Sequence, residues 1–134
     1  MLCYLETNLQ LFQQQKTWNN ELEKKALERI AQVVIETILD VGNAMIDGFI
    51  MRDPGSYEDI IDILLDEKVL TESDASAFKE VIFYRKNLVQ DYLDIDIDQL
   101  VAMLQHHFTT IYSFSTSIRT YLENELGPVS AFKK

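Results

Sequence analysis

Apolar residues recur along the chain at the three- and four-residue spacing of amphipathic helices, and no stretch alternates apolar and polar residues long enough to indicate a half-buried strand. Glycine and proline, which interrupt helices, occur only four times and twice. The pattern predicts five helical segments, at residues 2–16, 19–50, 57–68, 72–93 and 97–126. We therefore expect an all-α protein, an antiparallel helical bundle of four main helices plus a short helix.

The breaks between these helices have local chemical causes. The proline of Asp53-Pro54-Gly55 biases the residue before it away from helical backbone, and the glycine is free to turn, so this tripeptide should end the second helix. Three candidate N-caps then begin the following helices, each with a polar partner three residues later: Ser56 with Asp59, Thr71 with Asp74, and Asp96 with Gln99.

The last predicted helix should end at Gly127-Pro128, because proline offers no backbone donor and glycine accepts a left-handed exit. Residues 127–134 would then form a C-terminal tail, either lying on the body or disordered. With 134 residues, 47% of them hydrophobic, the chain has enough apolar material for one core. We expect residues 1–134 to form a single domain.

The second segment is predicted to be the central helix, because its apolar stripe is so wide that only a narrow polar strip remains. The strip recurs at helical spacing and comprises Arg29, Gln32, Glu36, Asp40, Asn43 and Asp47. It has two interpretations: it is the solvated side of the bundle, or it lines a groove or a subunit contact.

Arg85 breaks the helical pattern of the fourth segment. On a helical wheel it lies near the middle of a sector of roughly 120° that is otherwise apolar; the sector holds Phe78, Val81, Ile82, Leu88, Val89 and Tyr92. A guanidinium stays protonated, so once withdrawn from water it needs a carboxylate, a set of carbonyls or an anion such as phosphate. Glu36 or Asp40 is the candidate carboxylate, across a cleft or a dimer seam.

The composition limits the possible partners. A formal charge of −10 repels nucleic acid and anionic membranes on average, so any contact with RNA has to be local. Lys79, Arg85 and Lys86 are close enough in sequence to form a small positive spot, although the acidity can equally serve solubility alone. Apolar runs fall far short of the roughly 20 residues of a membrane span, and the N-terminus lacks the basic region of a secretory signal. We expect a cytoplasmic protein with no membrane contact.

Several chemical motifs are excluded by spacing. Asp94, Asp96 and Asp98 begin like a calcium loop, but Gln99 and Gln105 occupy the positions that require glycine and glutamate. His106 and His107 are adjacent and diverge by about 100° on a helix, so they cannot share a metal. One should lie at the surface and the other should be partly buried. The sequence also has a single cysteine and no glycine-rich phosphate loop. We therefore expect no metal and no cofactor.

The sequence around Arg85 resembles the signature Arg-Asn-x-x-x-His-x-Tyr of the HepT-like members of the HEPN superfamily. The matching residues are Tyr84-Arg85-Lys86-Asn87-Leu88-Val89-Gln90-Asp91-Tyr92-Leu93. The predicted central helix, with an acidic residue at Glu36, and the segment 57–71 are also similar to that family. The resemblance implies a toxin of a prokaryotic toxin–antitoxin pair, which forms a homodimer through the helix that carries the motif. It also implies metal-independent RNA cleavage, in which a ribose 2′-hydroxyl attacks the neighbouring phosphate, the arginine holds the phosphate and the histidine moves the proton.

The chain departs from this signature at two positions. Gln90 stands in place of the histidine, and glutamine forms hydrogen bonds but cannot supply general acid–base catalysis, which is typically worth roughly 10² to 10⁴ in rate. Lys86 replaces the asparagine that follows the arginine. Tyr92 matches the family tyrosine, which in some members is nucleotidylated by the antitoxin, a minimal nucleotidyltransferase.

Four functional hypotheses follow. The first is an RNA-directed HepT-like dimer whose ribonuclease activity is impaired at Gln90. The second is an active RNase toxin, in which His106 or His107 on the following helix would supply the proton transfer. The third is a non-catalytic dimeric module that binds a protein or a nucleotide. In the fourth, Arg85 is only neutralised by Glu36 or Asp40 and the dimer has a role unrelated to RNA.

Overall fold

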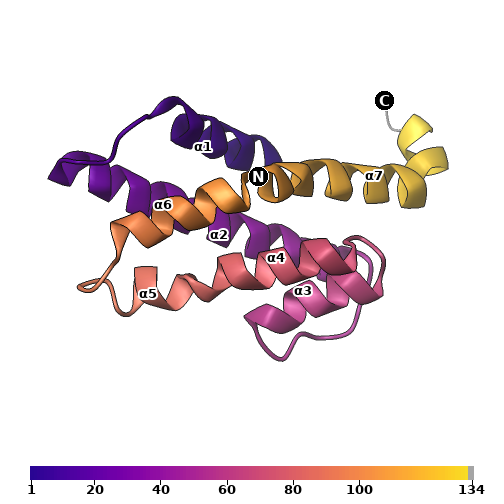
Figure 1. Ribbon diagram of the computed structural model, residues 1–134. Coiled ribbons are helices and arrows are strands. Elements are labelled where there is room, and N and C mark those ends of the chain that lie inside the picture. The colour runs from indigo at the N-terminus through magenta and orange to yellow at the C-terminus, as the bar shows by residue number, and fades with distance from the viewer. Residues whose placement is uncertain (133–134) are drawn as a thin grey trace.

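The computed structural model describes residues 1–132, and all regular elements among them are α-helices (Figure 1). Their bounds are α1 (Leu2–Gln14), α2 (Glu21–Gly48), α3 (Tyr57–Asp66), α4 (Glu72–Phe83), α5 (Arg85–Val89), α6 (Ile97–His106) and α7 (Phe108–Phe132). The predicted all-α fold is confirmed. No helix within these residues is long and apolar enough to cross a membrane.

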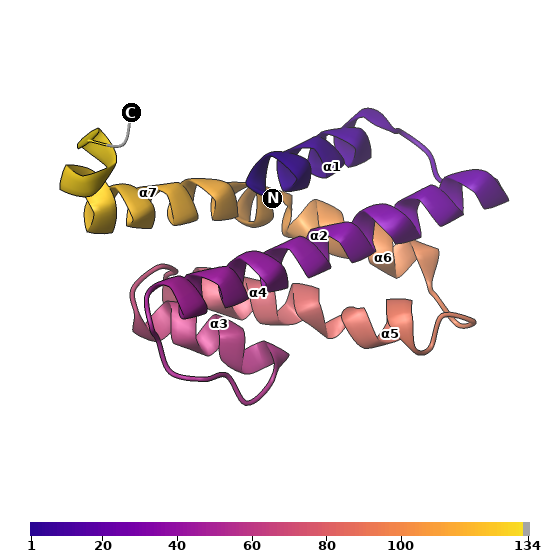
Figure 2. The ribbon, with the colours of Figure 1, turned by 180° about the vertical axis from the view of Figure 1, so that it is seen from behind.

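The long helix α2 is central, as its apolar pattern predicts. It packs against α1, α3, α5 and α6, and Figure 2 shows it running along the bundle with α1 above it and α3 and α5 below it. Its inward residues, from Leu27 through Met45 and Ile46, are buried in one continuous core with side chains of every other helix. On the polar strip, Gln32 and Glu36 are half-buried and Arg29, Asp40, Asn43 and Asp47 are exposed. Most of this strip is thus exposed on the single chain.

One close approach fixes α3 on α2. A Cβ atom placed at the buried Gly42 would lie 2.6 Å from Cγ2 of Ile60, which is too close for any real contact. Ile60 is itself buried and branched at Cβ, so it cannot move aside easily. The absence of a side chain at Gly42 therefore permits the packing that places the start of α3 beside the site.

The predicted N-caps are all present. The side chains of Ser56, Thr71 and Asp96 accept hydrogen bonds from backbone N–H groups three residues later and begin α3, α4 and α6. A further cap was missed by the sequence analysis. Asn20 and Glu23 form a reciprocal capping box at the start of α2, so this helix begins at Glu21.

The prediction of one helix over residues 72–93 was wrong in its second half. The chain forms α4, breaks at Tyr84, and forms only the short α5, which ends at Val89. Beyond it, the Asn87 side chain donates to the carbonyl oxygens of Asp91 and Asp94, at 3.2 and 3.3 Å. The Asn87 side chain thus gives these backbone groups an alternative to helical hydrogen bonds. Because the helix ends before Tyr92, this residue does not lie on the helical face on which the sequence placed it.

Two boundaries near the C-terminus were also predicted wrongly. The segment 97–126 is not one helix, because it breaks at His107 between α6 and α7. Gly127-Pro128 does not end the last helix, since α7 continues to Phe132. Proline can bend a helix instead of ending it, and the last turns of α7 turn away from the axis of the earlier ones (Figure 1). Residues 133–134 of the predicted tail lie outside the described residues.

Candidate functional site

Arg85 forms an ion pair with Glu36 inside a single chain. The Nε atom of Arg85, at the start of α5, donates to Oε1 of Glu36, on α2, at 2.6 Å. The two side chains are 23% and 35% exposed, so the pair lies at the edge of the core and remains in contact with solvent. Of the two candidate carboxylates, Glu36 is the one in contact with Arg85, whereas Asp40 is exposed. No second subunit is needed for this contact.

Tyr57 supplies a second contact to the same guanidinium. The Cζ atom of Arg85 lies 4.4 Å from the centroid of the Tyr57 ring, a cation–π geometry. Tyr57 is the first residue of α3, directly after the Ser56 cap. The sequence analysis did not identify it, and its only signal was an aromatic residue beside an N-cap. Glu36 and Tyr57 together hold the guanidinium by Nε and by one face, and Nη1 and Nη2 take no part in the Glu36 bond.

These residues border an open pocket of about 690 Å³, which we call the arginine pocket. It is lined by Ser56, Tyr57, Glu58, Ile82, Phe83, Arg85, Lys86, Asn87, Gln90 and Asp91. The structure thus brings together three of the predicted site residues, Arg85, Lys86 and Gln90. Glu58 and Asp91 also line the pocket, so the formal charges of its lining balance and its positive charge is local to Arg85 and Lys86.

Tyr92 and Lys79 do not line the arginine pocket. Tyr92 follows the end of α5 and is 61% exposed, so the prediction that it faces inward was wrong. Lys79 Nζ lies 2.6 Å from Oδ1 of Asp62, and the hydrogen bond that Lys79 donates to this carboxylate raises the pKa of the lysine. The predicted positive spot therefore reduces, at this pocket, to Arg85 and Lys86.

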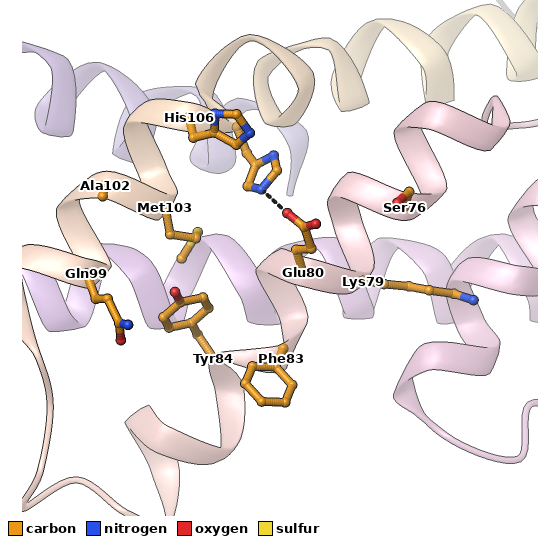
Figure 3. A pocket seen from close by; sticks show the side chains of 10 residues that line it. Ser76, Lys79, Glu80, Phe83, Tyr84, Gln99, Ala102, Met103 and His106 are labelled. Carbon is orange, nitrogen blue, oxygen red and sulfur yellow. Dashed lines mark hydrogen bonds and ion pairs between the residues drawn. The ribbon is translucent and has the colours of Figure 1, made fainter.

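A second pocket of about 630 Å³ contains both histidines, and we call it the histidine pocket (Figure 3). The Nε2 atom of His107 lies 2.7 Å from Oε2 of Glu80 on α4, and the two imidazole centroids are 4.6 Å apart. His107 is buried and His106 is exposed, as predicted. In Figure 3 the rings of Phe83 and Tyr84 lie at the opposite end of the pocket from His106. Proton transfer from these histidines to a ligand on Arg85 stays a prediction.

Within residues 1–132 there is no group of three or more histidine, cysteine, aspartate or glutamate side chains placed to hold a metal ion. The chemistry available at the arginine pocket is hydrogen bonding and charge. Arg85 and Lys86 can bind an oxyanion, and Gln90 can donate to or accept from it. Gln90 cannot exchange a proton near neutral pH.

Apolar side chains are exposed where the motif segment ends. Val89, Tyr92 and Leu93 are 37%, 61% and 87% exposed, and we call them the α5 patch. Val89 was predicted to face the core, and the early end of α5 explains why it does not. Isolated exposed apolar residues are common, but these three lie within five positions of one another in the sequence.

Comparison with known proteins gives one family. The model of the family described as Ribonuclease HepT-like matches residues 1–118. The chain is 54% identical over 132 residues to a protein of Bacillus subtilis (strain 168) called YutE, named provisionally as an RNase, with 98% of this chain and 92% of that protein covered.

Solved structures agree with this family. The structure of YutE from Bacillus subtilis, described there as a cytosolic protein of unknown function, superposes with a TM-score of 0.92 at 53% identity and covers 95% of this chain and 89% of that one. A tri-AMPylated HEPN toxin of Shewanella oneidensis in complex with its MNT antitoxin has a TM-score of 0.79 at 18% identity, with 89% and 93% covered. This second likeness shows that the fold is that of HEPN toxins.

Proposed function

The chain belongs to the Ribonuclease HepT-like family, and we propose that it is an RNA-directed homodimer whose endoribonuclease activity is impaired by Gln90. The observation that carries the proposal is the arginine pocket, where Arg85 and Lys86 border the same space as Gln90. Arg85 and Lys86 provide positive charge and hydrogen-bond donors for a phosphate, whereas Gln90 has no group that transfers a proton near neutral pH.

Phosphate binding follows from how Arg85 is held. Glu36 binds Nε, and Tyr57 packs against the plane of the guanidinium. An arginine fixed in this way loses little further side-chain freedom when a phosphate accepts hydrogen bonds from its terminal nitrogens. Charge-assisted hydrogen bonds of this kind are among the stronger polar contacts in proteins. RNA is the ligand class because the family is one of ribonucleases.

Catalysis by attack of a 2′-hydroxyl requires that a proton leave this hydroxyl and that another reach the leaving oxygen. Gln90 can orient either oxygen by a hydrogen bond, but its amide takes up no proton near neutral pH. The missing acid–base step corresponds to roughly 10² to 10⁴ in rate. Phosphate binding and orientation remain, so we expect RNA binding with little cleavage.

The α5 patch supports a homodimer through the motif segment. Val89, Tyr92 and Leu93 are exposed apolar residues that flank Gln90 and Asp91, which line the arginine pocket. In a two-fold dimer the same patch is used on both subunits, so one patch would cover the other and bring the two arginine pockets near the same seam. Light scattering on the purified protein tests this part of the proposal.

A nucleotidyltransferase antitoxin is the proposed protein partner, in the cytoplasm. The Shewanella oneidensis relative of this fold is AMPylated and was solved in complex with MNT antitoxin. Tyr92 is 61% exposed here, so a modifying enzyme can reach its hydroxyl in the free subunit. Mass spectrometry of the protein incubated with ATP and such an enzyme would test the modification, with Tyr92→Phe as the control.

The test of catalysis restores the missing group. With metal chelated, the Gln90→His variant should cleave single-stranded RNA at least a hundredfold faster than the unmodified chain. The double variant Gln90→His, Arg85→Ala should lose this gain, because the phosphate is no longer held. The proposal fails if the unmodified chain already cleaves RNA rapidly and Gln90→His leaves the rate unchanged.

A further inference from the structure

The histidine pocket has the chemistry of a site for a neutral, flat ligand. Among the described residues that line it, the one lysine, Lys79, is bound to Asp62 at 2.6 Å, and the one carboxylate, Glu80, is bound to His107 at 2.7 Å. Because Lys79 is already bound to a carboxylate and Glu80 is negatively charged, this pocket offers a phosphate little electrostatic attraction. The volume of about 630 Å³ is within the range of roughly 300 to 1,000 Å³ usual for small-molecule sites.

The walls of this pocket are aromatic and apolar, with a few polar groups. Figure 3 shows the rings of Phe83 and Tyr84 on one side, Met103 between them and the histidines, and the Gln99 amide opposite Tyr84. An aromatic ring provides a face for stacking, and an amide both donates and accepts hydrogen bonds. This combination suits a nucleobase, which has two flat faces and a polar edge.

Phe83 connects the histidine pocket with the arginine pocket. It is the one residue that lines both, and it is 76% exposed. A ligand that extends from one pocket to the other must therefore pass over this ring. Arg85 and Lys86 line one pocket together with Glu58 and Asp91, and the other pocket holds Glu80 and Lys79, which is bound to Asp62.

From this arrangement we infer that the histidine pocket is a nucleobase subsite for single-stranded RNA whose phosphate lies on Arg85. The inference rests on the proposed function, because the phosphate on Arg85 sets the position of the neighbouring base. The base stacks on Phe83, and its edge meets the Gln99 amide. Stacking on an aromatic side chain is available to all four bases, so the subsite adds affinity with little sequence preference.

The experiment compares two labelled RNA octamers, octauridylate and an octamer of the same backbone with abasic ribose at every position, by fluorescence anisotropy at one salt concentration. The whole chain should bind octauridylate about fivefold to a hundredfold more tightly than the abasic octamer, the range given by base stacking. Phe83→Leu should remove most of this difference. Gln99→Ala should reduce the difference from within the histidine pocket alone.

Tyr4→Leu is the matched control, because Tyr4 is an aromatic residue on α1 that is 56% exposed and outside both pockets. Tyr4→Leu should keep the full difference in affinity between octauridylate and the abasic octamer. Light scattering of each variant shows whether the oligomeric state is retained. If Phe83→Leu changes the oligomeric state, the inference is judged by whether Gln99→Ala reduces the difference in affinity between the two octamers. Equal binding of the two octamers by the unmodified chain overturns the inference and leaves the proposed phosphate role standing. If neither octamer binds, the proposed function fails and the inference fails with it.

Discussion

The Nε atom of Arg85 donates to Oε1 of Glu36 at 2.6 Å, although the two residues are 49 positions apart in the chain. The bond joins α5 to the central helix α2 and fixes the side chain that we propose binds phosphate. It also explains how a charged residue is tolerated on a mainly apolar face. The ring of Tyr57 completes the support on a second side.

A double-mutant cycle measures the energy of this pair. Arg85→Ala, Glu36→Ala and the double variant should give a coupling free energy of about 0.5 to 1 kcal/mol by urea unfolding, modest because both side chains remain partly solvated. Effects that add to within about 0.3 kcal/mol would mean that the contact contributes nothing to stability.

Tyr57 should act as a positioning residue for Arg85. Replacing it by leucine removes the cation–π contact, and we expect about twofold to fivefold weaker binding of an RNA octamer. Tyr57→Phe keeps the ring and should restore the affinity of the original chain. If Tyr57→Phe binds as weakly as Tyr57→Leu, the hydroxyl and not the ring face is responsible.

Gly42→Ala tests the close packing of α3 on α2. The new methyl group would lie 2.6 Å from Ile60, so we expect a loss of about 1 to 3 kcal/mol in the free energy of unfolding. Gly48→Ala is the control in the same helix, because a Cβ atom there meets nothing within 4 Å. It should leave the stability unchanged or raise it slightly through helix propensity. Equal losses for both variants would contradict the packing argument.

Asp59 should make stability depend on pH in the acid range. The Arg52 side chain and the Gly55 N–H donate to its carboxylate and lower its pKa below the ordinary value of 3.8. A lowered pKa in the folded state stabilises the protein above the ordinary value, and this contribution is lost as the pH falls through the lowered one. Asp59→Asn should therefore be less stable than the original chain at pH 6, and the gap should shrink below about pH 4. Thermal unfolding at both pH values measures it, and a gap that does not change with pH would exclude this mechanism.

The sequence predicted the parts of this structure that depend on local chemistry or on strong periodicity. The wide apolar stripe of α2 identified it as the central helix, and three capping residues gave the starts of α3, α4 and α6. The break at Tyr84 and the end of α5 at Val89 were missed, because periodicity continues past them and the Asn87 hydrogen bonds that replace the helix reach residues up to seven positions away. Helix continuation through Pro128 was missed because proline can either bend or end a helix.

The sequence likewise predicted only part of the candidate site. An arginine on an apolar face required an anionic partner, and helical spacing narrowed the choice to two carboxylates, of which Glu36 is the one in contact. Tyr57 could not be found, because its contact with Arg85 depends on how α3 packs on α2, and a wheel drawn for one helix contains no such information. The separation of Lys79 from Arg85 likewise follows from its bond to Asp62 on another helix.

The most direct test of the account is RNA binding by two arginine variants. Arg119 is the control for Arg85, because it too is paired with a glutamate, Glu6, and its replacement changes the net charge equally. We expect Arg85→Ala to weaken binding of an RNA octamer about tenfold or more and to lower its dependence on salt, while Arg119→Ala binds like the original chain. Equal affinities for Arg85→Ala and Arg119→Ala, with both variants folded, would contradict the claim that Arg85 holds a phosphate.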